Sequence, residues 1–218
     1  MGSTPTVGAP HIAVREITPA DGEFLVDMVL EAVNWEREHH TRRGVLGNAR
    51  LSRYAVGWGR QGDLGLVAVD LDGPRGLHVP IGAAWLRYFA SSEPGYGFYE
   101  PGVPELTLAI VPGRRRLGIG HALLAALIAR ARESGVRRIS LSVARDNEAA
   151  VRLYTQAGFV SVGEGKGPGG TWTMLLEMSD GEGAPQSVGS PPSASAREGT
   201  TTSDASASAS SAPPSTSS

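Results

Sequence analysis

The chain alternates apolar and polar positions in several short runs, a pattern typical of strands. Residues 11–17 alternate in this way, and a further alternating run begins at Glu105 and stops at Pro112. Two β-rich runs flank Asp72-Gly73-Pro74, a tripeptide that favours a turn, so we expect a hairpin there. The pattern predicts strands over residues 11–17, 64–70, 79–88, 105–111, 138–143, 159–163 and 171–178.

Between these strands, apolar residues recur at the spacing of helices. Thr18-Pro19-Ala20-Asp21 has the composition of a helix start, and Gly135 stands where a C-cap belongs. The expected helices run from that start to about Trp35, from Asn48 to Gly57 or Gly59, over residues 119–131 and over residues 147–157. The order β-α-α-β-β-β-α-β-α-β-β predicts an α/β (α+β) domain whose first half is largely antiparallel.

The last part of the chain has a different composition. Residues 181–218 contain no aromatic residue, no Leu and no Ile, and twelve of these 38 residues are Ser. Such a segment buries too little apolar surface to offset the entropy lost on ordering. We therefore expect a flexible N-terminus over residues 1–10, one domain over residues 11–180 and a disordered tail over residues 181–218.

Charge and cysteine content exclude several classes of protein. The tail holds one of the 20 basic and three of the 22 acidic residues, so the expected domain has 19 of each and a formal charge of zero. This balance argues against broad binding to nucleic acid or to an anionic membrane. The absence of Cys excludes disulfides, thiolate metal sites and a Cys nucleophile. Adjacent His39 and His40 point apart on a helix, so we expect no metal.

Targeting features point to the cytoplasm. No apolar run approaches the roughly 18 residues of a membrane span, and the N-terminal residues lack the apolar segment of a signal peptide. Of the 20 basic residues only Lys166 is Lys, a bias typical of GC-rich coding sequence. We therefore expect a bacterial, cytoplasmic protein.

Residues 111–120, VPGRRRLGIG, carry the first candidate chemistry. They join an expected strand to an expected helix through a turn that contains Gly. A helix N-terminus presents free backbone N–H groups and the positive end of the helix dipole, which suit a pyrophosphate. The spacing is neither G-x-G-x-x-G nor a Walker motif. Taken alone, this turn is equally compatible with an ordinary strand-to-helix connection.

Residues 146–159, DNEAAVRLYTQAGF, make the pattern specific. Together with Arg115 to Gly120, which fits [QR]-x-x-G-x-[GA], they resemble the GNAT superfamily of acetyl-CoA-dependent N-acetyltransferases, in that family's order and spacing. The resemblance is specific from about Glu105 to Phe159 and only topological before it. It implies a GNAT fold: a mixed central sheet of about six to seven strands, flanked by about four helices, with a splayed pair of central strands.

The resemblance also implies where acetyl-CoA binds as co-substrate. The turn into the helix would wrap the pyrophosphate, the end of the preceding strand would pair with the amides of pantetheine, and an Asn would bond to the pantetheine arm. The positions so implied are Ile110, Val111, Arg115, Arg116, Leu117, Gly118, Ile119, Gly120 and Asn147. Arg116 departs from the family pattern, in which Gly is more usual. Arg114, Arg115 and Arg116 are expected to face the phosphates.

Two further residues match catalytic positions of the family. Tyr154 matches the Tyr that protonates the departing thiolate in many members, and Glu105 matches a Glu that accepts the amine proton in several. A core aromatic residue and a solvated strand-end carboxylate are the alternatives for these two positions. Glu93, Glu100 and Glu105 are expected to gather on the amine side, where the loop over residues 88–104 mixes carboxylates with aromatic rings suited to a cationic amine.

The function implied is transfer of acetyl from acetyl-CoA to a primary amine by direct attack in a ternary complex, with no covalent enzyme intermediate and no metal. A non-catalytic acyl-CoA-binding or sensing module is the alternative, and so is a transferase for a longer acyl group. The acceptor stays open between small-molecule amines, such as aminoglycosides or polyamines, and protein amines. The resemblance also allows a homodimer.

Overall fold

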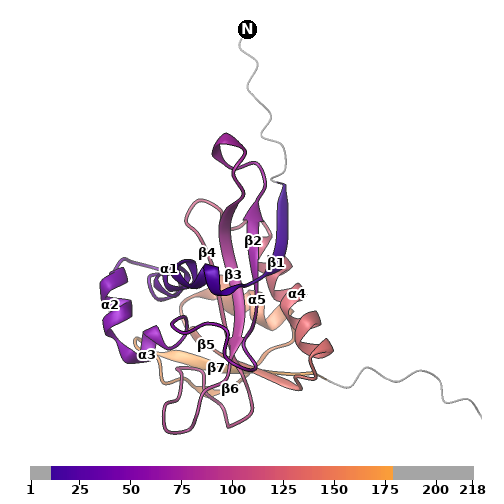
Figure 1. Cartoon of the computed structure of the whole chain (residues 1–218). Coiled ribbons are helices and arrows are strands. Elements are labelled where there is room, and N and C mark those ends of the chain that lie inside the picture. The colour runs from indigo at the N-terminus through magenta and orange to yellow at the C-terminus, as the bar shows by residue number, and fades with distance from the viewer. Residues whose placement is uncertain (1–10, 179–218) are drawn as a thin grey trace, which may run out of the picture. The chain divides into compact units, whose positions relative to one another are not determined.

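A computed structural model of the chain describes residues 11–178 (Figure 1). The expected flexible N-terminus and the expected tail lie outside these residues. The strands are β1 (Ile12–Glu16), β2 (Leu64–Asp70), β3 (Val79–Arg87), β4 (Glu105–Ile110), β5 (Arg138–Ala144), β6 (Val160–Glu164) and β7 (Thr171–Glu177). The helices are α1 (Gly22–Val33), α2 (Arg42–Gly47), α3 (Ala49–Ser52), α4 (Ile119–Glu133) and α5 (Glu148–Gln156), with short 3-10 turns at Pro19–Asp21 and Pro74–Gly76.

The seven strands form one mixed sheet in the order β1-β2-β3-β4-β5-β7-β6. Every neighbouring pair is antiparallel except β4 and β5, which are parallel. The α5 helix lies between β5 and β6 along the chain, and β7 returns between these two strands in the sheet. The expected α+β architecture and the number of strands are confirmed.

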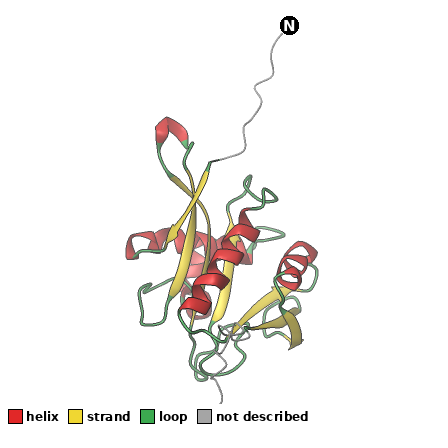
Figure 2. Ribbon diagram, turned by 90° about the vertical axis from the view of Figure 1, so that its right-hand side faces the viewer, coloured by secondary structure: helices red, strands yellow, loops and turns green. Residues whose placement is uncertain are grey.

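Helices cover both faces of the sheet. The α1 helix packs on β3 and β4, whereas α4 packs on β2, β3 and β4, and α5 packs on β5. In Figure 2 the α4 helix lies in front of the strands, on the side that faces the viewer. Two hydrophobic cores result, because alternate side chains of each strand point to opposite faces. One core contains Leu106 and Ile110 of β4 together with α4, and the other contains Ala109 of β4 together with α1.

The two central strands are splayed, as expected. β4 and β5 share one register pair, Glu105 with Ser140, next to a bond from the Ser140 amide to the Pro104 carbonyl of 3.0 Å. By contrast, β4 pairs with β3 along its whole length, from Glu105 to Ile110. The main-chain groups of β4 that face β5 beyond the shared pair therefore have no strand to bind. The gap that opens between β4 and β5 is called the notch below.

The segment between α1 and β2 differs from the sequence-based expectation. α2 was not expected, because two of its six residues, Gly44 and Gly47, are poor helix formers. Capping compensates, since the hydroxyl of Thr41 accepts a bond from the Gly44 amide at 3.1 Å. The helix expected from Asn48 to Gly57 or Gly59 is the four-residue α3, which Asn48 caps, followed by turns.

A buried ion pair holds the C-terminal end of α3 against β3. The Arg87 guanidinium, 1% exposed, binds the Asp63 carboxylate at 2.7 Å. It also donates to the carbonyls of Arg53, Val56 and Gly57 at 2.7–2.9 Å. Every donor that points into the protein thus meets an acceptor, as a buried charge requires.

We expect Arg87→Met to lower the free energy of unfolding by about 3–5 kcal/mol, because it leaves the Asp63 carboxylate buried without its partner. Arg42→Met is the matched control, since Arg42 forms an exposed pair with Asp27 at 2.7 Å and such pairs contribute about 1 kcal/mol or less. Urea unfolding measures both variants, and equal losses would contradict the assignment.

Candidate active site

The turn before α4 is shaped by three residues with left-handed backbone. Gly113 and Gly118 each have φ of 80°, and Arg116 has φ of 62°. A left-handed conformation costs a residue with a side chain about 1–2 kcal/mol, which explains why Gly is usual at the position of Arg116. The sequence departs from the family pattern there, but the backbone still makes the turn.

The N-terminus of α4 leaves a set of backbone donors for an anion. Ala122 donates to the Gly118 carbonyl at 3.1 Å, which closes the first turn of the helix. The first amides of a helix have no acceptor within it, and the helix dipole adds partial positive charge at this end. A Cβ added at Gly120 would meet Leu153 and Leu108 only at ordinary contact distance, so the packing there leaves room for a methyl group. The residues from Leu117 to Gly120 thus lie where a helix N-terminus offers backbone donors of the kind that suit an anion.

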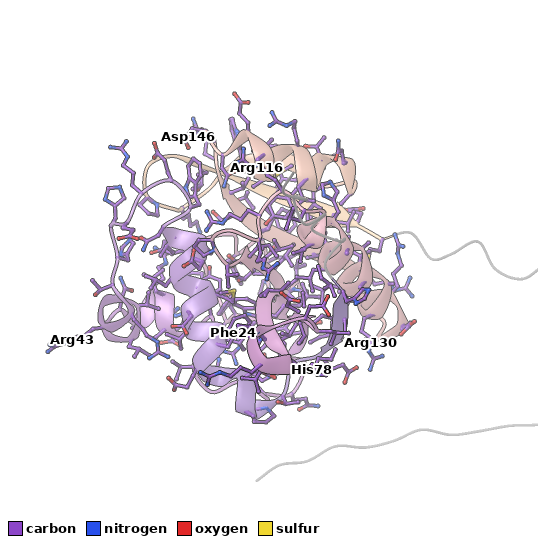
Figure 3. All side chains as sticks on the ribbon, turned by 90° about the horizontal axis from the view of Figure 1, so that it is seen from above. Phe24, Arg43, His78, Arg116, Arg130 and Asp146 are labelled. Atoms are coloured by element: carbon purple, nitrogen blue, oxygen red, sulfur yellow. The ribbon has the colours of Figure 1, made fainter. Side chains whose placement is uncertain are left out.

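The arginine run is mostly bound by acidic groups of the chain itself. Arg114 pairs with Asp70, and Arg115 pairs with Glu31 of α1 at 2.8 Å. The Nε of Arg115 also donates to the Ile110 carbonyl at 3.1 Å. Only Arg116 carries an exposed side chain with no such pair shown, and in Figure 3 it lies toward the same edge of the molecule as Asp146. Two of the three guanidinium groups expected to face phosphates thus already bind carboxylates of the chain, and contact of the run with phosphates stays a prediction.

The main chain of β4 decides which residues face the notch. The Val111 amide donates to the Ile81 carbonyl at 3.0 Å, and the Val111 carbonyl accepts a bond from Arg114 at 3.2 Å. Because main-chain groups alternate along an antiparallel strand, the groups of Leu108 and Ile110 point the other way, into the notch. Both backbone groups of Val111 are thus in use, and Leu108, which the sequence did not single out, joins Ile110.

Asn147 has a local structural role. It is the N-cap of α5, and its side-chain oxygen accepts a bond from the Ala150 amide at 3.1 Å. This bond uses the oxygen and not the Nδ2 group, which remains a possible donor to a ligand. At the other end of α5, Oε1 of Gln156 lies 3.1 Å from Nε2 of His121 on α4. This hydrogen bond connects the two helices on this face of the sheet.

Tyr154 is buried on the face of the sheet that α4 and α5 cover. Its side chain is 7% exposed and belongs to the core that contains Leu106, and its ring meets the ring of Phe159 edge-on at 5.7 Å. Burial raises the pKa of the Tyr154 hydroxyl well above its ordinary value. Tyr154 therefore holds its proton at neutral pH.

Glu105 is buried at the start of β4, only 3% exposed. Its Oε1 accepts bonds from the Tyr54 hydroxyl at 2.6 Å and from the Gly97 amide at 2.7 Å. Its Oε2 is buried with no hydrogen-bond partner in the described part of the chain. Burial raises the pKa of Glu105 to about 7, against the opposing effect of these two bonds. The alternative of a solvated strand-end carboxylate is therefore wrong.

A glycine-rich segment of the loop between β3 and β4 closes over Glu105. An ideal Cβ at Gly95 would overlap Oε2 of Glu105 and lie 2.6 Å from the Tyr54 hydroxyl. A Cβ at Gly97 would overlap the backbone of Leu141 and Ser142 in β5. The loop thus enters the junction of β4 and β5, and only residues without side chains fit there.

Glu105 and Tyr154 belong to opposite faces of the sheet. Tyr154 lies in the core with α4, whereas Tyr54, which binds Glu105, lies in the core with α1. β4 separates the two groups, and the notch is the place where the sheet is open beside it.

The acids of the loop do not gather as an open acidic patch. Glu93 lies 3.8 Å from Arg53, Glu100 pairs with Arg138, and Glu105 is buried. Each expected carboxylate therefore has its own partner or cover, and the expectation of a common acidic surface is wrong. The loop does present Tyr96, whose ring lies 4.6 Å below the Arg50 guanidinium.

Within residues 11–178, no three His, Asp or Glu side chains lie close enough together to hold a metal ion. The same residues contain no helix that is long and apolar enough to cross a membrane. The site thus consists of backbone amides, two buried titratable groups and the notch between β4 and β5.

This combination of a splayed mixed sheet and an anion-binding turn defines an acyltransferase-type fold, and sequence comparison gives the family. The Acetyltransferase (GNAT) family model matches residues 30–159. The chain belongs to this family, as the motifs predicted. It is 30% identical over 166 residues to a mycothiol acetyltransferase of Paenarthrobacter aurescens, covering 73% of this chain and 47% of that protein. A mycothiol acetyltransferase of Cellulomonas flavigena is 28% identical, covering 81% of this chain and 50% of that protein. The chain spans about half the length of these curated relatives.

Solved structures share the fold. A putative acetyltransferase from Salmonella typhimurium, solved with its cofactor acetyl-CoA, superposes with a TM-score of 0.57 at 24% identity, covering 80% of this chain and 98% of that chain. A putative acetyltransferase from Acinetobacter baylyi has a TM-score of 0.59 at 18% identity, covering 83% of this chain and 99% of that chain. These likenesses establish the fold.

We expect Gly95→Ala to lower the free energy of unfolding by about 1–3 kcal/mol, because the added methyl group overpacks the Glu105 carboxyl. Gly47→Ala is the matched control, since a Cβ at Gly47 meets no atom within 4 Å. Urea unfolding of both variants tests the close approach of the loop to Glu105. A Gly95→Ala protein as stable as the control would show that the loop does not lie on this carboxyl.

Proposed function

We propose that the chain is an acetyl-CoA-dependent N-acetyltransferase that moves acetyl to a primary amine by direct attack in a ternary complex. The observation that carries the proposal is that Glu105 and Tyr154, two buried titratable groups, belong to opposite faces of the sheet to which β4 contributes. Membership of the GNAT family supports it. A non-catalytic acyl-CoA-binding module and a transferase for a longer acyl group are the alternatives that the experiments below separate.

The described residues fit acetyl-CoA as co-substrate. The amides from Arg115 to Gly120 at the start of α4 would hold the pyrophosphate, with Arg116 as the exposed cation. The main-chain groups of Leu108 and the amide of Ile110 would pair with pantetheine, since the Ile110 carbonyl already accepts a bond from Arg115. Asn147 would donate through Nδ2. Acetyl-CoA supplies the activated acetyl group as a thioester.

Three groups of the chain would then serve the reaction. Glu105 takes a proton from the acceptor amine, so that its nitrogen can bond to the acetyl carbon. A β4 amide in the notch stabilises the charge that develops on the carbonyl oxygen. Tyr154 gives its proton to the sulfur as the carbon–sulfur bond breaks. Glu105 then releases the proton taken from the nitrogen to water and Tyr154 takes one up from water, so that both groups return to their starting states. The products are an amide and a free thiol, with no covalent enzyme intermediate.

The acceptor is a separate question. The curated relatives are named mycothiol acetyltransferases, but the chain spans only about half their length. A screen of aminoglycosides, polyamines, peptides with free N-termini or Lys, and the compound that these relatives acetylate would identify the acceptor. Each reaction is followed by release of free thiol and by the mass of the product. Binding of acetyl-CoA without transfer to any amine would favour the non-catalytic alternative.

We expect Tyr154→Phe to lower kcat by about 10²- to 10⁴-fold, because the departing thiolate loses its proton donor. The ring and its packing on Phe159 are kept, so the affinity for acetyl-CoA, measured by calorimetry, should not change. A kcat equal to that of the unmodified protein would assign Tyr154 to the core alone.

We expect kcat/KM to fall as the pH drops below about 7, by about tenfold per pH unit, because Glu105 with its raised pKa must be ionised to accept a proton. Above that pH the profile should level off until another group titrates. The amine acceptor also titrates, so the profile is repeated with acceptors of different basicity. If the acidic limb of the kcat/KM profile followed the pKa of every acceptor tested, and if it persisted in Glu105→Gln, this role of Glu105 would be contradicted.

A further inference from the structure

We propose that Tyr54 is a positioning residue for Glu105: its hydroxyl occupies Oε1, so that Oε2 is the oxygen that accepts the proton of the acceptor amine. The inference rests on the proposed function, because it assigns an atom to the base of that reaction. Tyr54 lies in the turn after α3, and 51 residues separate it from Glu105 in the sequence.

The hydrogen bonds around the carboxyl are one-sided. Oε1 receives the Tyr54 hydroxyl at 2.6 Å and the Gly97 amide at 2.7 Å, whereas Oε2 receives no donor. Two donors on one oxygen stabilise negative charge there and lower its basicity. A carboxylate held in this way takes up a proton on its other oxygen. The structure therefore distinguishes the two oxygens chemically.

The orientation of the Tyr54 hydroxyl is set by a third bond. Its oxygen accepts the Tyr96 amide at 2.6 Å, so its one proton is directed to Glu105. Burial and the neighbouring negative charge of Glu105 both raise the pKa of Tyr54 well above its ordinary value. Tyr54 therefore remains a donor over the whole range in which Glu105 titrates.

The backbone around Tyr54 is held by β3. The indole of Trp85 donates to the Tyr54 carbonyl at 2.8 Å, and the buried Arg87 binds the carbonyl of the preceding Arg53 at 2.7 Å. The Tyr54 ring packs edge-on against Phe89 at 5.0 Å and parallel to Tyr96 at 6.4 Å. These contacts leave the hydroxyl little freedom to turn away from Glu105.

The elements around Glu105 differ in the charged and titratable groups that they bring close to its carboxyl. The α3 helix supplies Arg50, whose positive charge favours the ionised carboxyl. On β3, the register partner is Arg87, and its charge is neutralised by Asp63. The turn after α3 contributes Tyr54, and the loop between β3 and β4 contributes Tyr96. The register partner of Glu105 on β5 is the uncharged Ser140. Tyr54 is thus the side chain that binds the carboxyl directly.

Gly95 is the group that covers Oε2. A side chain at this position would overlap Oε2, so the glycine backbone alone lies against it. The proposal requires the backbone at residue 95 to shift, so that the acceptor amine, or one water bound to it, can take this place. The proton then passes from the amine nitrogen to Oε2, while Oε1 keeps the Tyr54 hydroxyl. The nitrogen lone pair that this releases forms the bond to the acetyl carbon.

The test is Tyr54→Phe, examined first without any substrate. Protein labelled with ¹³C at the Glu side-chain carboxyl is titrated by NMR, with Glu105→Gln to assign the signal. Because a hydrogen bond to a charged group contributes about 1.5–3 kcal/mol, we expect the pKa of Glu105 to rise by about 1–2 units in Tyr54→Phe. The acidic limb of kcat/KM should move up by the same amount, and the affinity for acetyl-CoA should be unchanged.

Tyr88→Phe is the matched control, because it removes a hydroxyl from a half-exposed ring at the end of β3. We expect it to leave both the carboxyl titration and the pH profile where they are. An unshifted Glu105 titration in a folded Tyr54→Phe protein would overturn the proposal, and so would equal shifts in the two variants.

One further readout does not depend on the Tyr54→Phe variant. In the unmodified protein labelled at the tyrosine hydroxyl carbons, Tyr54 should stay protonated at a pH of about 10, where an ordinary tyrosine is half ionised. Ionisation of Tyr54 at that pH would overturn the proposal even if Tyr54→Phe does not fold. The same experiments distinguish failure of the role of Tyr54 from failure of the proposed function. An unmodified protein that transfers acetyl but shows no effect of Tyr54→Phe on Glu105 contradicts only the role of Tyr54. A shifted pKa of Glu105 in Tyr54→Phe, when the unmodified protein acetylates no amine, contradicts only the proposed transferase activity.

Discussion

The single register pair between β4 and β5 is the constraint on which the site depends. Because Glu105 and Ser140 pair and the strands then diverge, the main-chain groups of Leu108 and Ile110 are left facing an open notch. A sheet that continued to pair would bury these groups in its ladder and close the passage between its two faces. The same divergence leads β4 into the turn before α4, where further backbone donors are free of partners. The backbone groups that we propose for binding and the carboxyl that we propose for chemistry thus share one structural cause.

The start of β4 also determines the chemistry of the carboxyl beside the notch. Glycines at positions 95 and 97 let the loop enter the junction of the strands, and this burial raises the pKa of Glu105 to about 7. An exposed carboxyl would be a weaker base, because its pKa would lie well below neutrality. Trp85 and Arg87 bind backbone carbonyls of the turn that carries Tyr54. The packing on this face thus supports one of the two polar contacts that differentiate the carboxyl oxygens, the other being the Gly97 amide.

Much of the fold could be predicted from local pattern, because strand alternation and the helical spacing of α4 and α5 reflect which face each residue buries. α2 was not predicted, because its two glycines are poor helix formers and the cap at Thr41 that stabilises the helix was not recognised. The site was predictable where it consists of motif residues close in sequence. The ion pairs of Arg114 and Arg115 could not be predicted. Their partners, Asp70 and Glu31, lie 44 and 84 residues away in the sequence, and no local pattern identifies them. The same holds for Tyr54, whose role appears only once β3 has placed its backbone.

The central claim is that the notch and the turn before α4 together hold acetyl-CoA. Amide hydrogen exchange with and without acetyl-CoA tests it most directly, because the backbone groups concerned are free of partners before binding. The account predicts slower exchange at Leu108, at Ile110 and from Arg115 to Gly120, with no change in β1 and β2, which lie away from the notch. Unchanged exchange at these amides under saturating acetyl-CoA, or protection confined to another part of the domain, would contradict it.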